Sequence, residues 1–442
     1  MSTTDGRSSF DAIVLGAGIS GLVSASILVD QGATRVLVVD EYAQVGGNHI
    51  DRTHGRYTFD VGSLIFQDDS PLLQHFPELQ SRYVPISPSW TRLNPQGKVT
   101  EYPFSVKDDL LGAGVVECAR ILGSAIAARA RRRPLRHAQD FGRYWIGPRL
   151  MRRSGLESYM ERFFGQRTEM IDLKFAEKRM LWISEHASVA NLWRRFVRLP
   201  GRRAVGGPTN QQLARPREGF AYLYQPAVER LEASGVTFRL GAQLTSLRSL
   251  AAGFRLEADG HGFDGDRIIS TIPIGRALQL CGIPGHEPLP TVTLISLFFS
   301  FAGQRGFAES ILYNFSHQGA WKRLTMYSDF YGCAEGREFF AVEVIGDQVE
   351  RSVDRAVDDF RTHTAQNQLF VGDLRLEGSF VLTEAYPIYT HGAAGRSEQA
   401  IADLREFGLE SFGRQGAFQY QPTARVSTLE AEAALARPAD QG

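Results

Sequence analysis

The most informative chemical signal in the sequence is a glycine-rich turn close to its start. Gly16, Gly18 and Gly21 form a GxGxxG motif. In such a motif the first glycine permits a tight turn, the second lets the backbone approach a pyrophosphate, and the third allows close helix–strand packing. Asp40 lies 19 residues after Gly21, where its carboxylate is placed to accept hydrogen bonds from a ribose diol. This spacing predicts a dinucleotide site with the pyrophosphate at a helix N-terminus.

A strand–turn–helix–strand unit is needed to position these residues. The apolar run 10–15 predicts a strand, residues 19–29 have helical spacing, and 35–40 is a second β-branched run. This order opens a doubly wound α/β fold. Later runs that lack convincing helical crossovers predict a second, antiparallel sheet. Further strands are expected at 237–240, 254–258, 267–272, 291–301, 338–345 and 375–382, and helices at 108–132 and 138–162.

Composition limits the class of protein. The 442 residues carry 49 Lys+Arg and 49 Asp+Glu, and this zero net charge argues against a nucleic-acid partner. The three cysteines form no CxxC pair and the ten histidines show no HxH or HExxH spacing, so we expect no metal. A reducing cytoplasm fits this cysteine usage best. The polar N-terminus lacks an apolar signal core, and we therefore expect a cytoplasmic protein.

Arginines are concentrated in two segments. Residues 129–153 contain nine of them, and 192–203 contain five more. Solvated helix faces are the simplest interpretation. An anionic substrate, such as a sugar diphosphate, and an anionic membrane surface are the sharper alternatives. Peripheral membrane contact therefore stays open at this point, as does the oligomeric state.

A second glycine pair and an aspartate segment point to the kind of dinucleotide. Val45-Gly46-Gly47-Asn48 follows the strand that ends at Asp40, and Tyr57-Thr58-Phe59-Asp60-Val61-Gly62-Ser63 comes shortly after it. This combination resembles the two-dinucleotide-binding-domain flavoproteins, which include amine oxidases, protoporphyrinogen oxidase and UDP-galactopyranose mutase. The resemblance implies non-covalent FAD, with the glycine pair near the pyrophosphate and ribityl chain and the FD-x-G segment near the isoalloxazine. NADPH lacks support, because there is no second GxGxxG and no arginine directly after Asp40.

The resemblance assigns a set of residues to the cofactor. Residues 243–244 fall where the family contacts adenine through its backbone. The expected FAD-binding residues are Gly16, Gly18, Ile19, Ser20, Gly21, Asp40, Glu41, Gly46, Gly47, Asn48, Val61, Gly62, Ser63, Leu64, Leu244, Gly413, Arg414 and Tyr420.

The C-terminal part is closest to the mutases. Gly413-Arg414-Gln415-Gly416-Ala417-Phe418-Gln419-Tyr420 resembles their GRxGxxxY motif, and Tyr386-Pro387 is mutase-like. Trp321-Lys322-Arg323 aligns with the mutase strand that brings an arginine to the substrate diphosphate. Three departures follow: Leu64 stands where the mutases have a histidine, Ile183 where they have a second substrate arginine, and Pro422 near an aspartate position. Only some of the residues with which the mutases bind the sugar diphosphate are therefore present.

Each candidate catalytic or substrate-binding residue could instead have a purely structural role. Arg323 is either a diphosphate ligand or a surface arginine on a strand, and Tyr420 lies either near flavin or substrate or in the core. Trp182, Tyr327 and Tyr386 are pocket candidates, although aromatic residues on strands and helices are more often core. His49 is the histidine placed to approach FAD, but a solvated loop histidine is the more common outcome.

The whole sequence predicts an α/β protein with a Rossmann-like FAD-binding domain, a helical insertion and an antiparallel-sheet substrate domain. The FAD-binding domain is assigned to 10–75, 205–285 and 392–430, the helical domain to 105–204, the substrate domain to 76–104 and 286–391, and flexible termini to 1–9 and 431–442.

Three functions are compatible with the sequence. The leading hypothesis is an FAD-dependent oxidoreductase resembling the protoporphyrinogen and amine oxidase group, acting on a small molecule or sugar-derived metabolite. The alternative is a mutase-like, net non-redox, ring-contracting isomerase on a sugar nucleotide. A non-catalytic flavin-binding protein is the third.

Overall fold

The first sheet is built from the β-branched runs that surround the glycine turn. The computed structural model describes residues 9–62, 65–130, 134–179 and 210–436. The strands of this sheet are β1 (Ser9–Leu15), β2 (Val36–Asp40), β10 (Val236–Leu240), β11 (Leu244–Ser249), β12 (Phe254–Ala258), β13 (His261–Ser270) and β19 (Glu410–Ser411). Their order is β10-β2-β1-β13-β12-β11, with β19 beside β13. The first four are parallel, and β11 and β12 form an antiparallel edge.

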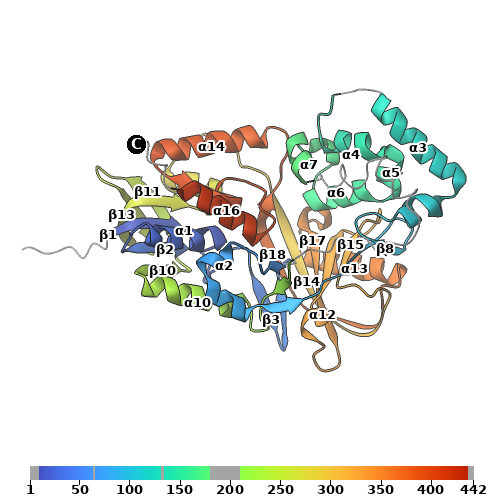
Figure 1. Ribbon diagram of the computed structural model, residues 1–442, viewed down its shortest axis with the longest axis horizontal. Helices are drawn as coiled ribbons and strands as arrows, with labels where there is room; N and C mark the ends of the chain where they lie inside the picture. Colours follow the sequence, from blue (N-terminus) through green and yellow to red (C-terminus); the bar gives the residue numbers. More distant parts are fainter. Residues whose placement is uncertain (1–8, 63–64, 131–133, 180–209, 437–442) are drawn as a thin grey trace, which may run out of the picture.

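Helices cover both faces of this sheet (Figure 1). They are α1 (Ile19–Asp30), α10 (Phe220–Ala233), α11 (Ile274–Cys281), α14 (Ala393–Phe407), α15 (Gly413–Gly416) and α16 (Ala424–Leu435). Apolar side chains of α1, α10 and α16 form one core with β1 and β2, and those of α11 and α14 form a second core on the opposite face. The expected α/β fold with a Rossmann-like domain is confirmed. The flexible terminus expected from 431 is wrong as far as Leu435, because Ala431 and Leu435 are buried in the first core.

The second sheet is the predicted antiparallel one. Its strands are β7 (Trp90–Leu93), β8 (Val99–Glu101), β14 (Thr291–Arg305), β15 (Ile311–Asn314), β16 (Trp321–Met326), β17 (Glu338–Ile345) and β18 (Phe370–Pro387). Their order is β18-β14-β17-β16-β15-β7-β8, in which only β15 and β7 run parallel to each other. The helix α13 (Val353–Gln366) packs Phe360 against Phe299 and Phe340 on one face. The other face is left for the helical part of the chain and for the site.

Short elements lie between the longer strands and helices of the two sheets. They are β3 (Asp51–His54), β4 (Tyr57–Asp60), β5 (Phe66–Gln67), β6 (Val84–Ile86), β9 (Gln212–Ala214), α2 (Leu72–His75), α12 (Ser328–Tyr331) and the turns η1 (Pro77–Arg82) and η5 (Gly346–Val349). β9 pairs with both β5 and β6. The predicted domain boundary at 76 therefore comes too early, because Phe76, Leu79 and Tyr83 are buried in the core beside α1. The second sheet begins at β7.

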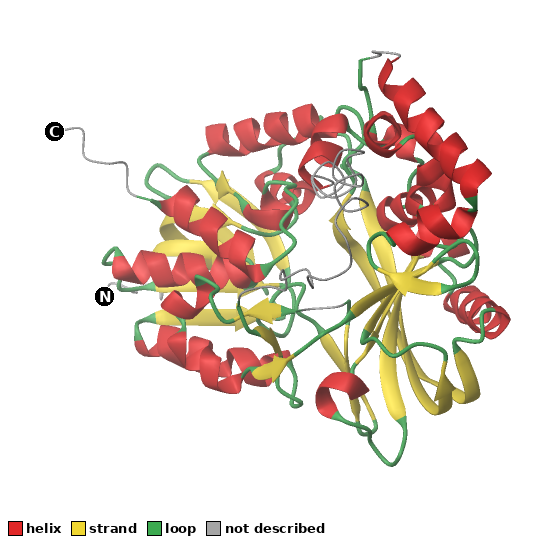
Figure 2. Cartoon of the chain, turned by 45° about the vertical axis from the view of Figure 1, so that its right-hand side comes forward, coloured by secondary structure: helices red, strands yellow, loops and turns green. Residues whose placement is uncertain are grey.

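The helical part lies at one end of the molecule (Figure 2). Its elements are η2 (Val106–Leu110), η3 (Leu111–Ala113), α3 (Val115–Ala130), α4 (Ala138–Ile146), α5 (Pro148–Arg153), α6 (Leu156–Phe164), η4 (Thr168–Met170) and α7 (Leu173–Arg179). The single helix expected at 138–162 is three helices. The backbone turns at Gly147 and Gly155, and a Cβ at Gly155, whose φ is +75°, would overlap the carbonyl oxygen of Phe315.

A buried ion pair joins Asp60, the last residue of β4, to Arg215, which directly follows β9. Arg215 Nε donates to Asp60 Oδ1 at 2.5 Å, and Arg215 Nη2 donates to the carbonyl of Thr58 at 2.7 Å. Both charged side chains are almost fully buried. Burial raises the pKa of Asp60 to about 6, although the charge of Arg215 opposes this shift. The aspartate of the FD-x-G segment therefore joins two parts of the chain that are far apart in sequence.

Gly155→Ala should destabilise the protein by about 3 kcal/mol, because it combines an unfavourable φ with a collision against Phe315. Gly282 is the matched control, since its φ is +67° but a Cβ added there would have no heavy atom within 4 Å. Gly282→Ala should cost about 1 kcal/mol. Urea unfolding of both variants measures the difference, and equal losses would contradict the close contact at Gly155.

Candidate functional site

A cavity of about 720 Å³ lies where the two sheets approach each other. The carboxyl ends of β1 and β2 open into it, and β14 to β18 supply the opposite wall. This is the edge at which parallel α/β sheets usually bind ligands. Fifteen of the residues expected at the site line it: Gly16, Gly18, Ile19, Ser20, Asp40, Glu41, Gly46, Gly47, Asn48, Val61, Gly62, Arg323, Tyr386, Arg414 and Tyr420.

Two glycine turns press against each other at the cavity wall. Gly46 N donates to the carbonyl of Ala17 at 2.9 Å, and a Cβ at Gly47 would lie 3.0 Å from the Cα of Gly18. Gly18 caps α1 without a side-chain hydrogen bond. The N–H groups of the first helical turn thus remain available to a ligand, and the helix dipole favours an anionic one. Gly21 is not part of the wall, and its role is the predicted one of close packing against Gly16.

Asp40 has a role that the motif did not indicate. Its Oδ2 accepts from Ala17 N at 2.6 Å, and its Oδ1 accepts from Tyr42 N at 2.8 Å. Burial raises the pKa of Asp40, and these two backbone donors oppose the shift. Asp40 therefore fixes the glycine turn in addition to lining the cavity. Contact with a ribose diol stays a prediction.

The residues after Asp40 form a small polar network. Arg276 on α11 places Nη2 at 2.6 Å from Glu41 Oε1 and donates from the same atom to the carbonyl of Leu244 at 2.7 Å. Arg276 and Glu41 line the cavity, but Leu244 lies behind Arg276 and does not. The structure therefore places Arg276 on the cavity wall, bonded to the backbone of Leu244, and the contact of Leu244 with adenine stays a prediction. A lone arginine in the segment after Pro273 carried no motif that would have revealed it.

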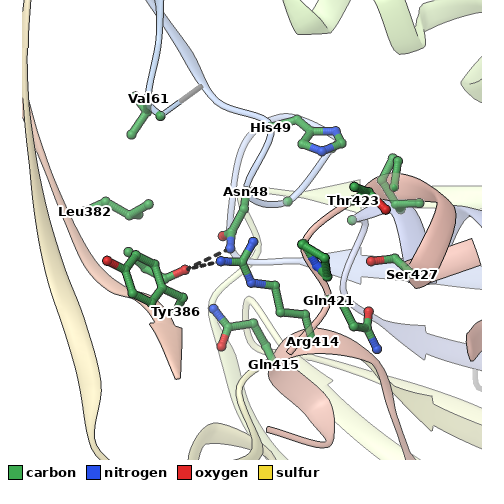
Figure 3. Close-up of a pocket in the computed structure, with 18 of the residues that line it drawn as sticks. Asn48, His49, Val61, Leu382, Tyr386, Arg414, Gln415, Gln421, Thr423 and Ser427 are labelled. Atoms are coloured by element: carbon green, nitrogen blue, oxygen red, sulfur yellow. Dashed lines mark hydrogen bonds between the residues drawn. The ribbon is translucent and has the colours of Figure 1, made fainter. Parts of the chain in front are cut away.

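One main-chain carbonyl joins the second glycine loop to the C-terminal motif. Asn48 Nδ2 donates to Ala385 O at 3.1 Å, and Arg414 Nη2 donates to the same oxygen at 3.5 Å (Figure 3). Burial lowers the pKa of Arg414. Among the residues that the structure describes, no carboxylate lies within ion-pair distance of Arg414. A buried cation without an anionic partner fits a negatively charged ligand in the cavity. Gly413 does not line the cavity and instead packs against Ser20.

The FD-x-G segment is held in place by a hydrogen bond from a buried tyrosine. The φ of Gly62 is +106°, and Tyr327 donates from its hydroxyl to the carbonyl of Gly62 at 2.7 Å. Tyr327 is fully buried and does not line the cavity, so its expected place in the substrate pocket is wrong. It positions Gly62 and Val61, which do line the cavity. Ser63, Leu64 and Trp182 lie outside the described residues.

A cluster of two cations and one anion forms part of the wall. Arg323 on β16 lies directly opposite Glu343 on β17, and Arg323 Nε donates to Glu343 Oε1 at 2.7 Å. Arg323 Nη2 bonds the same oxygen, and Lys322 Nζ lies 2.8 Å from Oε2. Burial alone would raise the pKa of Glu343, but the charges of Arg323 and Lys322 hold it at about 2. Arg323 therefore reaches the cavity, with two of its guanidinium nitrogens already engaged.

Aromatic side chains complete this part of the cavity. Tyr386 donates to the carbonyl of Phe163 at 2.9 Å, and its ring lies 5.1 Å from Lys322 Nζ. Burial raises the pKa of Tyr386, so the phenol stays protonated. Tyr420 meets the ring of Phe175 edge-on with 5.4 Å between centroids. Both tyrosines line the cavity, Tyr420 from the C-terminal motif and Tyr386 from β18.

His49 is half-buried and contacts two aromatic side chains. Its Nδ1 lies 2.5 Å from the hydroxyl of Tyr224, and its ring stacks on Phe220. Burial lowers the pKa of His49 to about 3, and Arg414 adds to this shift. A neutral imidazole at the cavity wall replaces the solvated loop histidine that is the more common outcome for such a position.

Polar residues without a partner mark a part of the wall that sequence reasoning missed. Gln421 is 3% exposed, and neither of its amide atoms has a hydrogen-bond partner among the described residues. Ser70 Oγ and Gln212 Nε2 are buried as well and have no hydrogen-bond partner within the part of the chain that the structure describes. All three line the cavity. Buried polar atoms are rarely left unsatisfied, so this wall fits a polar ligand.

Comparison with known proteins agrees with this geometry. Residues 14–78 match the family model described as an NAD(P)-binding Rossmann-like domain. The structure of reduced UDP-galactopyranose mutase superposes with a TM-score of 0.80 at 18% identity, covering 96% of this chain and 94% of that one. Wild-type putrescine oxidase bound to putrescine superposes with a TM-score of 0.55 at 14% identity, covering 96% and 98%. The chain therefore shares the fold of these two enzymes.

Sequence matches to curated proteins cover only short stretches of the chain. A chloroplastic prolycopene isomerase of Arabidopsis thaliana is 48% identical over 60 residues, or 14% of this chain and 10% of the relative. The UDP-galactopyranose mutase of Mycoplasma pneumoniae is 40% identical over 70 residues, or 15% and 17%. The chain thus matches about a tenth to a sixth of the length of these relatives.

Glu343→Gln should lower the free energy of unfolding by about 3 kcal/mol near neutral pH, because it leaves two buried cations without their anion. The folded-state pKa of Glu343 lies below its ordinary value of 4.5, so its contribution is complete above that pH. It is lost as the pH falls from 4.5 towards 2. The difference between the two proteins should therefore shrink at acid pH.

Urea unfolding at neutral pH and at about pH 3 measures this difference. Glu406→Gln, at an exposed position on α14, is the control and should change stability little at either pH. A loss for Glu343→Gln that is equally large at both pH values would contradict the role of Glu343 as the counter-ion.

Proposed function

We propose that the cavity binds FAD non-covalently and that the protein is an FAD-dependent oxidoreductase acting on a small molecule. The unpaired polar wall formed by Ser70, Gln212 and Gln421 supports a large polar cofactor. The paired glycine turns offer bare backbone and the free end of α1 to a pyrophosphate. When bound, FAD supplies a hydride acceptor for a C–H bond next to nitrogen or oxygen.

One observation favours an oxidoreductase over a diphosphate-handling enzyme. Arg323 directs both Nε and Nη2 to Glu343 rather than into the cavity. A bidentate grip on a diphosphate needs two such nitrogens together, so this arginine is poorly disposed to provide it. Hydride transfer does not require that grip.

The chain's own residues shape the substrate side of the cavity. Val61, Leu294 and Leu382 present apolar side chains, and Phe163 and Tyr386 close the wall beside them. This surface excludes water from the reacting groups. The Lys322–Glu343–Arg323 cluster and Arg414 leave an excess of positive charge there, which favours a substrate carrying a negative or electron-rich group.

A second function has its own support. Arg323 and Arg414 both line the cavity, and the mutase structure superposes over nearly the whole chain. A mutase-like, net non-redox isomerase on a sugar nucleotide is therefore the alternative. Arg414 would supply the cationic contact to the diphosphate that Arg323 gives only in part.

Gly18→Asp should abolish FAD binding, because it puts a negative charge where the pyrophosphate is expected. A Cβ at Gly18 has only ordinary contacts, the nearest at 3.5 Å, so the variant should still fold. The flavin absorbance of the purified protein is the measurement, with circular dichroism to verify folding. Gly275→Asp is the control, since Gly275 is exposed at the start of α11 and should retain flavin. A folded Gly18→Asp protein that remains fully yellow would overturn the proposed site.

Nucleotide titration distinguishes the two functions. The dithionite-reduced protein is titrated with UDP and UDP-galactose while its visible spectrum is recorded, and its reoxidation by air is followed separately. An oxidoreductase should reoxidise readily and show no nucleotide response. A spectral shift with UDP that Arg414→Gln abolishes would support the mutase-like alternative. Bound flavin that dithionite cannot reduce would support the non-catalytic hypothesis instead.

A further inference from the structure

The helix α3 turns an apolar face towards solvent. Val115 is 88% exposed, Val116 65% and Ile126 64%, and Leu122 is exposed beside them. Figure 1 shows α3 at the outer edge of the helical part, with only one side against other helices. Helices on protein surfaces normally direct charged side chains to water. The helix α3 instead directs apolar side chains to water.

This orientation is fixed by packing on the inner side of the helix. Ile121 and Ala125 are buried, and a Cβ at Gly147 would lie 2.8 Å from the Cα of Ala125. Glu117 holds Arg149 of α5 with a hydrogen bond of 3.0 Å from Nε. Because these contacts bury the inner face, α3 cannot turn its outer face inward without losing them.

The exposed arc of α3 is continuous. At 100° per residue, the positions from Leu122 through Val115 to Ala127 fall within less than half a turn of the helix. Every exposed residue in this arc is apolar or glycine: Val115, Val116, Ala119, Leu122, Gly123, Ile126, Ala127 and Ala130. A contiguous apolar surface of this kind marks an interaction site.

Arginines border the arc on both sides. Arg120 is exposed at one margin, and Arg129 lies at the other, where its guanidinium packs 5.7 Å from the ring centre of Trp145. Arg152 on the adjoining α5 is exposed as well. Glu117 is the only acidic side chain on α3, and it is directed to the inner side. The surface therefore combines an apolar centre with a basic border.

We propose that α3 is an interfacial helix that docks the protein on an anionic lipid bilayer. An apolar stripe flanked by arginines is the pattern that inserts into the headgroup boundary, where the arginines meet lipid phosphates. No described helix is long and apolar enough to cross a membrane, so α3 lies along the surface. A second copy of the chain fits less well, because pairing through α3 would bring two arginine borders together.

Vesicle co-sedimentation of the purified full-length protein tests this proposal. Vesicles of phosphatidylcholine with phosphatidylglycerol should bind the protein at low salt, and high salt or phosphatidylcholine alone should reduce the bound fraction. Leu122→Asp/Ile126→Asp should lower the apparent affinity at least about tenfold, because it removes two apolar side chains and adds negative charge. Both sites are exposed, so the variant should fold.

Matched controls and an oligomer measurement complete the test. Val371→Asp and Leu429→Asp replace exposed apolar residues on β18 and α16 and should bind vesicles like the parent protein. Light scattering reports the oligomeric state in solution. The proposal is overturned if anionic vesicles fail to bind the parent protein or bind the α3 variant equally well. A dimer that the α3 variant dissociates would assign the face to a second copy and would also overturn it.

Discussion

The contact between two glycine turns is the constraint on which the site depends. A Cβ at Gly47 would lie only 3.0 Å from the Cα of Gly18, so the two turns pack closely, and Asp40 fixes the first turn through the N–H of Ala17. This contact brings the end of α1 and the loop after β2 to one wall of the cavity. Without it, the free N–H groups of α1 and the backbone at Asn48 would not face the same ligand.

The opposite wall of the cavity holds buried charged side chains that pair with one another. Strands β16 and β17 bring Lys322, Arg323 and Glu343 together in a buried place, where isolated charges would be costly. The carboxylate of Glu343 pairs with both cations, so the cluster keeps an excess of positive charge. Arg414, which has no such carboxylate among the described residues, adds to it. This part of the cavity wall therefore carries more positive than negative charge, while the nearby surface at Val61 and Leu382 is apolar.

Sequence patterns predicted the parts of the fold that local physics determines. The turn at Gly16 to Gly21, the helix after it and the strand ending at Asp40 follow from backbone conformation and residue periodicity. Contacts between residues far apart in the sequence were not predictable, because they depend on strand register and on how helices and loops pack. Thus Glu343 opposite Arg323, Arg276 in front of Leu244 and Tyr327 beneath Gly62 were missed or misplaced. The breaks at Gly147 and Gly155 were also missed, since the carbonyl that excludes a side chain at Gly155 belongs to Phe315.

The packing of α16 on α1 has a consequence for how the chain is made. Nearly every residue of α1 is buried, and the last described helix covers part of it, with Gln31 Nε2 donating to Leu435 O at 2.8 Å. During synthesis on the ribosome, α1 therefore emerges long before α16, so this part of its cover forms late. An apolar segment left open for so long is a natural target for chaperones and a hazard for aggregation. The same packing makes α1 and α16 a single cooperative unit once folding is complete.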